Sequence, residues 1–207
     1  MLSLDHIVIG APDLDTAIQA FSKTYGLEAV QGGAHPDLGT HNALIGAGDT
    51  YLELLAPIPG AHCTIPGLAA LKEPALYHYA LRTSDLEGIE THAAGLGLRS
   101  EGIQTGRRKT KDGSLLTWRI LHLRGHALGA TVPFFIDWQD SPNPATQLAP
   151  QVQEVMLKVT GSALLSTLLE GADGVELCEG AAALALTCAA EATVIRLEAP
   201  RPLPLGL

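Results

Sequence analysis

The chain has too few cysteines for a disulfide framework or a structural metal cluster. Cysteine occurs three times in 207 residues, as Cys63, Cys178 and Cys188, and no two of them have metal-ligand spacing. An odd number of widely spaced cysteines favours a reduced, cytoplasmic compartment. The first residues also lack a basic segment followed by an apolar stretch, so they do not resemble a secretory signal.

Long apolar runs, basic residues and aromatic residues are scarce as well. No run reaches the roughly 18 apolar residues of a membrane-spanning helix, so we expect no membrane contact. The formal charge of −9 and the pI near 5.2 argue against nucleic-acid binding, which requires a basic surface. Aromatic residues make up 4% of the chain, but 46% of the residues are hydrophobic, which suffices for a sizeable core.

A short pattern occurs twice in the chain, with a histidine at the same place in each copy. His6 in the first copy and His78 in the second are separated by the same interval as Asp13 and Asp85, which follow them. Repetition of this kind indicates two copies of one supersecondary unit. When such units pack together, equivalent positions can face each other, so the two histidines suggest a metal or acid/base site.

Turn residues and hydrophobic periodicity predict the elements of each copy. In residues 1–57 we expect strands at 4–9, 27–31, 39–45 and 51–55, and a helix from Asp13 to Gly26. In residues 75–140 we expect strands at 76–82, 99–106, 115–123 and 132–138, and a helix at 85–96. Each copy is therefore a βαβββ module, and the two modules form one domain over residues 1–140.

A third, degenerate βαβββ half-module is predicted at residues 150–200, after a linker rich in proline and polar residues. It contains no histidine. Alone it would leave one face of its sheet uncovered, so we expect it to pack on the first two modules or on its copy in a second chain. A homodimer is the expected assembly, and the expected fold class is α+β.

These modules resemble the vicinal oxygen chelate superfamily, which includes glyoxalase I, extradiol dioxygenases and fosfomycin-resistance proteins. The resemblance rests on the first-strand histidines and on the run Tyr51-Leu52-Glu53-Leu54. The segments 39–44 and 133–138 resemble the glyoxalase-like branch of that superfamily. The resemblance covers residues 1–140 and implies that the paired modules form a cup.

The resemblance also implies a metal ion in the cup, held by the first and fourth strands of each module. Carried over, the ligands are His6, Glu53 and His78, whereas the fourth position falls near Phe134 or Phe135, which cannot bind a metal. Two imidazoles and a carboxylate with open positions suit a divalent Zn, Fe, Mn, Ni or Co ion. Such an ion would polarise a carbonyl or activate water or O₂.

Other residues complete the predicted site. Strand alternation points Glu53 inward, where a carboxylate serves as a ligand or as a general base. His41 is either a second acid/base group or an ordinary strand histidine. An arginine beside an aromatic ring can hold an anionic group. The predicted substrate-binding residues are Arg108, Trp118, Arg119 and Phe135.

The leading functional hypothesis is a divalent-metal-dependent lyase, isomerase or dioxygenase that acts on a small, oxygen-rich substrate. In one form of this hypothesis the substrate is anionic. In this hypothesis Glu53 and His41 are catalytic. The alternative is a metal-free protein that binds or sequesters a small molecule in the same cup. A third reading is a structural paralogue that acts through its dimer surface.

Overall fold

The computed structural model describes residues 1–109, 115–190 and 193–199, and the side chains of residues 108 and 109 lie outside this description. Within it, no helix is long and apolar enough to cross a membrane.

The first module has the predicted order of elements. They are β1 (Ser3–Gly10), α1 (Leu14–Tyr25), β2 (Val30–His35), β3 (Thr40–Ala47) and β4 (Thr50–Pro57). The carboxylate of Asp13 accepts a hydrogen bond from the amide of Thr16 and so caps α1, and Gly26 ends the helix with φ +69°. Both predicted helix ends are thus confirmed, whereas β2 extends through Gly32 and Gly33, where a loop was predicted.

The second module follows the same plan with more interruptions. Its elements are β5 (Ala75–Arg82), α2 (Leu86–Gly95), β6 (Arg99–Ser100), β7 (Gln104–Lys109), β8 (Leu115–Leu121), β9 (Leu123–Arg124) and β10 (Phe134–Asp137). The strands predicted at 99–106 and 115–123 are each divided in two. Of these pieces, β6 and β9 pair with each other as a separate small sheet.

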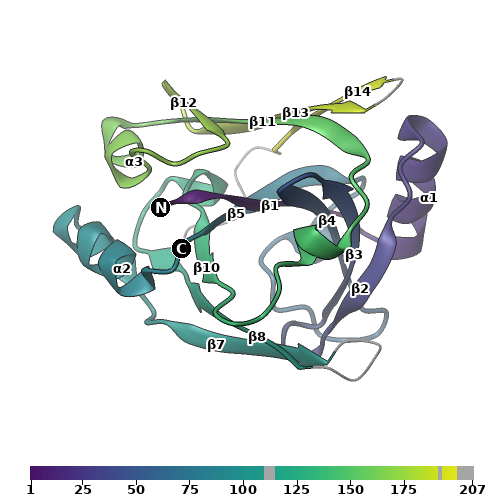
Figure 1. The fold of residues 1–207 in the computed structure, drawn as a ribbon, viewed down its shortest axis with the longest axis horizontal. Coiled ribbons are helices and arrows are strands. Elements are labelled where there is room, and N and C mark those ends of the chain that lie inside the picture. The colour runs from purple at the N-terminus through teal and green to yellow at the C-terminus, as the bar shows by residue number, and fades with distance from the viewer. Residues whose placement is uncertain (110–114, 191–192, 200–207) are drawn as a thin grey trace.

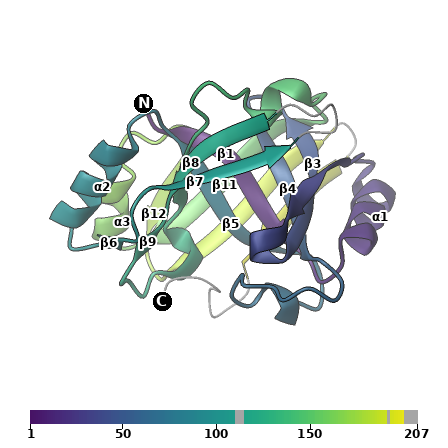
Figure 2. The same cartoon turned by 90° about the horizontal axis from the view of Figure 1, so that it is seen from below.

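The two modules join into one eight-stranded sheet in the order β2-β3-β4-β1-β5-β10-β8-β7. In each half the first strand is parallel to the last, as β1 is to β4 and β5 is to β10. The halves meet where β1 and β5 pair antiparallel. The sheet is strongly curled (Figures 1 and 2), and side chains of both modules line one hollow on its inner face, which confirms the predicted cup of paired βαβββ modules.

The third unit contains β11 (Val152–Gly161), α3 (Ala163–Leu168), β12 (Val175–Glu179), β13 (Ala183–Ala190) and β14 (Thr193–Glu198). Its element order is the predicted one. Its four-stranded sheet is ordered β12-β11-β13-β14, so the first strand pairs in parallel with the second and does not pair with the fourth. The third unit therefore repeats the chain order of a module but not its strand order.

This second sheet packs on the outer face of the large one, and α1 and α2 lie on either side of it (Figure 1). Ile7 and Tyr79 of the large sheet share one core with Leu157, Leu186 and Ile195 of the small sheet, and all five are at most 1% exposed. The third unit was predicted to pack either on the first two modules or on its copy in a second chain. In the structure it packs on the first two modules, and this contact covers the open face of its sheet.

Strand alternation leaves the opposite, inner face of the large sheet to the cavity. On β1, Ile7 and Ile9 enter the core between the sheets, whereas His6 and Val8 face the hollow. A register shift in the β1–β5 pairing lies beside Tyr77 and His78, which are consecutive and yet both line the hollow. An irregularity in the strand thereby adds a side chain to the inner face.

Candidate functional site

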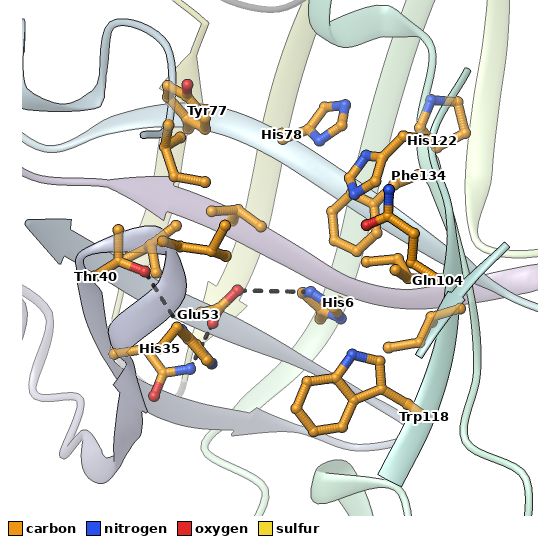
Figure 3. A pocket seen from close by; sticks show the side chains of 18 of the residues that line it. His6, His35, Thr40, Glu53, Tyr77, His78, Gln104, Trp118, His122 and Phe134 are labelled. Atoms are coloured by element: carbon orange, nitrogen blue, oxygen red, sulfur yellow. Dashed lines mark hydrogen bonds and ion pairs between the residues drawn. The ribbon is translucent and has the colours of Figure 1, made fainter. Parts of the chain in front are cut away.

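The cup encloses a cavity of about 430 Å³, lined by both modules (Figure 3). Apolar and aromatic side chains form most of its wall, among them Tyr77, Trp118 and Phe134. Of the predicted site residues, the cavity brings together His6, Glu53, His78 and Trp118. A concave, largely apolar space with a few convergent polar groups is typical of a small-molecule site.

His6 and Glu53 form the polar centre of the cavity. The Nε2 atom of His6 lies 3.6 Å from Oε2 of Glu53, and both residues are buried. The ring of His6 stacks on Tyr51 at a centroid distance of 4.7 Å and meets the ring of Phe134 at 5.4 Å. The imidazole is therefore held in one orientation, with Nε2 directed at Glu53 (Figure 3).

A second carboxylate, absent from the sequence prediction, lies on the other side of the imidazole. Nδ1 of His6 donates to Oδ1 of Asp5 at 2.7 Å, and Asp5 is fully buried. Burial lowers the pKa of His6, but the hydrogen bond to Asp5 and the charges of Asp5 and Glu53 outweigh it and raise that pKa above 6.5. His6 therefore holds its proton more firmly than a free imidazole does.

Asn42 fixes the carboxylate of Glu53. Its Nδ2 donates to Oε1 of Glu53 at 2.5 Å, while its Oδ1 accepts the amide of Gly33 at 2.8 Å. The pairing of β2 with β3 shifts register at this point, and a Cβ on Gly32 would overlap Oδ1 of Asn42. The two glycines predicted as a loop are thus a bulge that admits Asn42.

His78 lies in the cavity wall with its side chain engaged elsewhere. Its Nε2 donates to the carbonyl oxygen of Val132 at 2.9 Å, and its ring lies 5.2 Å from that of Phe134. Burial lowers the pKa of His78 to about 3, with the nearby charges of His122, His6 and Arg124 adding to the effect. His78 is therefore neutral at physiological pH.

The predicted metal ligands do not converge. Among the described residues, no group of three or more His, Cys, Asp or Glu side chains is arranged to hold an ion. Phe134 stands at the fourth ligand position and its ring contacts both imidazoles, lying between His6 and His78 in Figure 3. The residues present thus do not fit a metal held by His6, Glu53 and His78.

Arg119 faces away from the cavity, contrary to its predicted role in substrate binding. It pairs with Glu87 of α2 at 2.5 Å and with Asp137 at 2.8 Å. Its neighbours Trp118 and Ile120 line the cavity, so alternation along β8 puts Arg119 on the other face. Arg108 lies in β7, and its side chain is outside the described part of the structure.

Alternation also corrects the predictions for His41 and Phe135. Thr40 and Asn42 line the cavity, whereas His41, which lies between them on β3, does not. Phe135 is fully buried in the core between the sheets, while Phe134 lines the cavity. Each prediction was one position out of register, which reverses the face of a strand.

One wall of the cavity carries groups that are not among the predicted site residues. His122 and His126 both line it, together with Arg124. Burial lowers the pKa of His122 to about 4, and Arg124 contributes. Arg124 forms a loose pair with Glu101 at 3.3 Å. The closely spaced histidines His122 and His126 are a sequence signal that could have indicated this part of the cavity.

Comparisons with known proteins agree with this architecture. The sequence profile of the glyoxalase-like domain family matches residues 4–170. This match extends beyond the predicted domain of residues 1–140 into the third unit. No curated protein sequence matches the chain significantly.

Solved structures of other proteins share the fold. A hypothetical protein from Staphylococcus aureus is similar over 95% of this chain and 99% of its own, with 16% identity and a TM-score of 0.72. A methylmalonyl-CoA epimerase in complex with methylmalonyl-CoA and NH4+ covers 67% of this chain and 97% of its own, with 22% identity and a TM-score of 0.51. A variant of the Streptomyces coelicolor methylmalonyl-CoA epimerase, in complex with 2-nitronate-propionyl-CoA, covers 68% and 97%, with 22% identity and a TM-score of 0.52.

At these identities the structures show the fold alone. The family match spans most of the chain, and the paired modules carry the strand order described above. The chain therefore belongs to the glyoxalase-like domain family.

Proposed function

We propose that the chain is an enzyme that transfers a proton at the carbon next to the carbonyl group of a small molecule bound in the cavity. The observation that carries the proposal is the buried contact of 3.6 Å between His6 and Glu53, which opens into a space of about 430 Å³. An acid and a base in contact inside an apolar pocket suit general acid–base catalysis.

Each of the two residues has a definite part in the reaction. Glu53 removes the proton from the carbon, and the electrons of that C–H bond move to the carbonyl oxygen to give an enolate. The protonated His6 gives its Nε2 proton to the developing oxygen anion, so that an enol forms and His6 becomes a neutral imidazole. Glu53 then returns a proton to the same face of the carbon while His6 recovers its own proton from the oxygen, which restores the carbonyl. The α-hydrogen is exchanged when the carboxyl group of Glu53 has exchanged its proton with solvent in between.

The neighbouring structures support this class of reaction. Two of them are epimerases in complex with CoA esters, and an epimerase inverts a single centre. We therefore propose an acyl thioester or a 2-oxo acid as the substrate class. No step is assigned to a metal ion, because Phe134 stands at the fourth ligand position and touches both imidazoles.

Proton exchange with solvent tests the proposal. The purified protein is incubated in D₂O with methylmalonyl-CoA, propionyl-CoA and 2-oxobutyrate, and loss of the α-hydrogen signal is followed by NMR. We expect exchange of at least one probe, reduced on the order of 100-fold or more in Glu53→Gln. The exposed residue Glu28 provides the control variant Glu28→Gln. The proposal fails if no probe exchanges, or if Glu53→Gln exchanges at the rate of the wild type.

A second candidate function is the metal-free binding or sequestration of a small molecule. It is favoured by the largely apolar wall formed by Val8, Leu55, Trp118, Ile120 and Phe134. In that case calorimetry would show tight binding of a probe that exchanges no proton, and Glu53→Gln would leave the affinity unchanged.

A further inference from the structure

We propose that Asp5 is a positioning residue that keeps the proton of His6 on Nδ1, so that Nε2 is the nitrogen that gives up and regains a proton in the cavity. The inference rests on the proposed function for its catalytic meaning. The geometry that carries it is independent of any reaction, because it concerns only which groups can donate to the Asp5 carboxylate.

Asp5 reaches this place through an irregularity in β1. Regular alternation would turn it away from the face that His6 occupies, but the pairing with β5 shifts register between Leu4 and His6. The carboxylate of Asp5 is fully buried, and its oxygens accept hydrogen bonds from three side chains. A buried carboxylate with this number of donors is held firmly in one orientation.

The two oxygens of Asp5 have different partners. Oδ1 accepts from Nδ1 of His6 at 2.7 Å, while Oδ2 accepts from Nε1 of Trp138 at 3.0 Å and from Nδ2 of Asn143 at 2.7 Å. Both residues on Oδ2 come from the segment that joins the second module to the third unit. That segment therefore supports the polar centre of the cavity through its hydrogen bonds to Asp5.

Neither partner of Oδ2 can become an acceptor. The indole nitrogen of Trp138 is a donor in every state. Asn143 could in principle flip, but its Oδ1 already accepts the amide of Ala145 at 2.8 Å, which keeps Nδ2 turned toward Asp5. Position 5 must therefore present an oxygen to these two donors.

This constraint makes the replacement Asp5→Asn informative. The amide oxygen must take the place of Oδ2, so the amide NH₂ must face Nδ1 of His6. Two donors cannot share one hydrogen bond, so Nδ1 must lose its proton and the neutral imidazole must carry it on Nε2. The side chain changes little in size, while the tautomer of His6 is reversed.

The tautomer matters for the proposed acid role. With Nδ1–H held by Asp5, His6 can release the proton on Nε2 and remain a neutral imidazole. With Nδ1 bare, loss of the Nε2 proton would produce an imidazolate, which is inaccessible near neutral pH. We therefore expect Asp5→Asn to slow proton exchange on the order of 10- to 100-fold, which is the usual effect of losing such an outer partner.

The test is ¹⁵N NMR of the histidine side chains in the full-length protein, with His6 assigned from His6→Gln. In the wild type we expect a protonated Nδ1, and in Asp5→Asn we expect its resonance in the range of an unprotonated ring nitrogen. Asn143→Ala serves as the matched control, because it removes one donor from Oδ2 and leaves the bond to Nδ1 intact.

An unprotonated Nδ1 in the wild type, or a protonated Nδ1 in folded Asp5→Asn, would overturn the inference. If Asp5→Asn does not fold, the wild-type spectrum and Asn143→Ala still decide it, because both must keep Nδ1 protonated. The predicted spectra without proton exchange in any variant would refute the proposed function and leave the positioning of His6 by Asp5 intact. Proton exchange that depends on Glu53, combined with spectra that contradict the predicted state of Nδ1, would support the proposed function and refute the positioning of His6 by Asp5.

Discussion

Asn42 donates to Glu53 across the β3–β4 pair at 2.5 Å, and it can do so because the neighbouring strand β2 bulges at two glycines. The same amide side chain accepts a backbone N–H from that bulge at 2.8 Å. The orientation of the proposed base therefore depends on a backbone irregularity two strands away.

Gly32→Ala tests that dependence. The new methyl group would overlap Oδ1 of Asn42, so we expect the side chain to shift and proton exchange to fall about 10-fold, an effect comparable to losing an outer hydrogen-bond partner. Gly95→Ala is the control, because nothing lies within 4 Å of a Cβ there and alanine favours a helix. Exchange rates and thermal unfolding report the result. An unchanged rate in Gly32→Ala would show that Asn42 does not orient the base.

Phe134→His tests why the metal ligands fail to converge. It places an imidazole where a ring now contacts both His6 and His78, so we expect Co²⁺ affinity to rise on the order of 10-fold or more, with the absorption of a tetrahedral site. The wild type should bind Co²⁺ weakly. Stoichiometric binding by the wild type that is lost in His6→Gln would instead support the three-residue metal site.

His78→Gln tests the buried neutral histidine through acid stability. The pKa of His78 is about 3 in the folded chain, against an ordinary value near 6.5 when unfolded. Between these values the unfolded chain binds one more proton, so stability is full above pH 6.5 and is lost as the pH falls toward 3. The slope from this residue is at most about 1.4 kcal/mol per pH unit.

Urea unfolding at several pH values from 7 to 4 measures this slope. Glutamine keeps a donor for the carbonyl oxygen of Val132 but cannot take up a proton. The free energy of unfolding of His78→Gln should therefore depend less steeply on pH, by the amount that corresponds to one proton. An identical slope in both proteins would show that His78 titrates normally in the fold.

Arg119→Gln should separate structure from binding. Arg119 pairs with Glu87 and Asp137 on the face opposite the cavity, so we expect a small loss of stability. The apparent KM of the exchange reaction should not change. A KM raised several-fold with stability intact would restore the substrate role that the sequence suggested.

Much of the fold could be predicted from the sequence, because short stretches of residues determine where each helix and strand begins and ends. The cap at Asp13, the stop at Gly26 and the repeated histidine identified two βαβββ modules, and the sheet has the strand order that such modules require. The strand order of the third unit could not be read in the same way, because pairing in its sheet depends on which face packs on the large sheet. Since that sheet already covers the open face, the reason given for a homodimer no longer applies, and the dimer stays a prediction.

The site was predicted in part. Alternation correctly placed His6, Glu53 and His78 on the inner face, where all three line the cavity. It could not place Asp5 or Tyr77, because bulges in β1 and β5 override the period of two. His41, Arg119 and Phe135 failed for the opposite reason: these strands are regular, and each residue lies next to the one that enters the cavity.

The central claim is that, inside the cup, Glu53 removes and returns the proton on carbon while His6 acts as the acid toward the carbonyl oxygen. The most direct test compares binding and exchange in the same samples, with calorimetry for probe affinity and NMR in D₂O for the rate, in the wild type, Glu53→Gln and His6→Gln. We predict affinities that differ little and exchange that falls on the order of 100-fold in both variants. Equal exchange rates at equal occupancy would contradict the account.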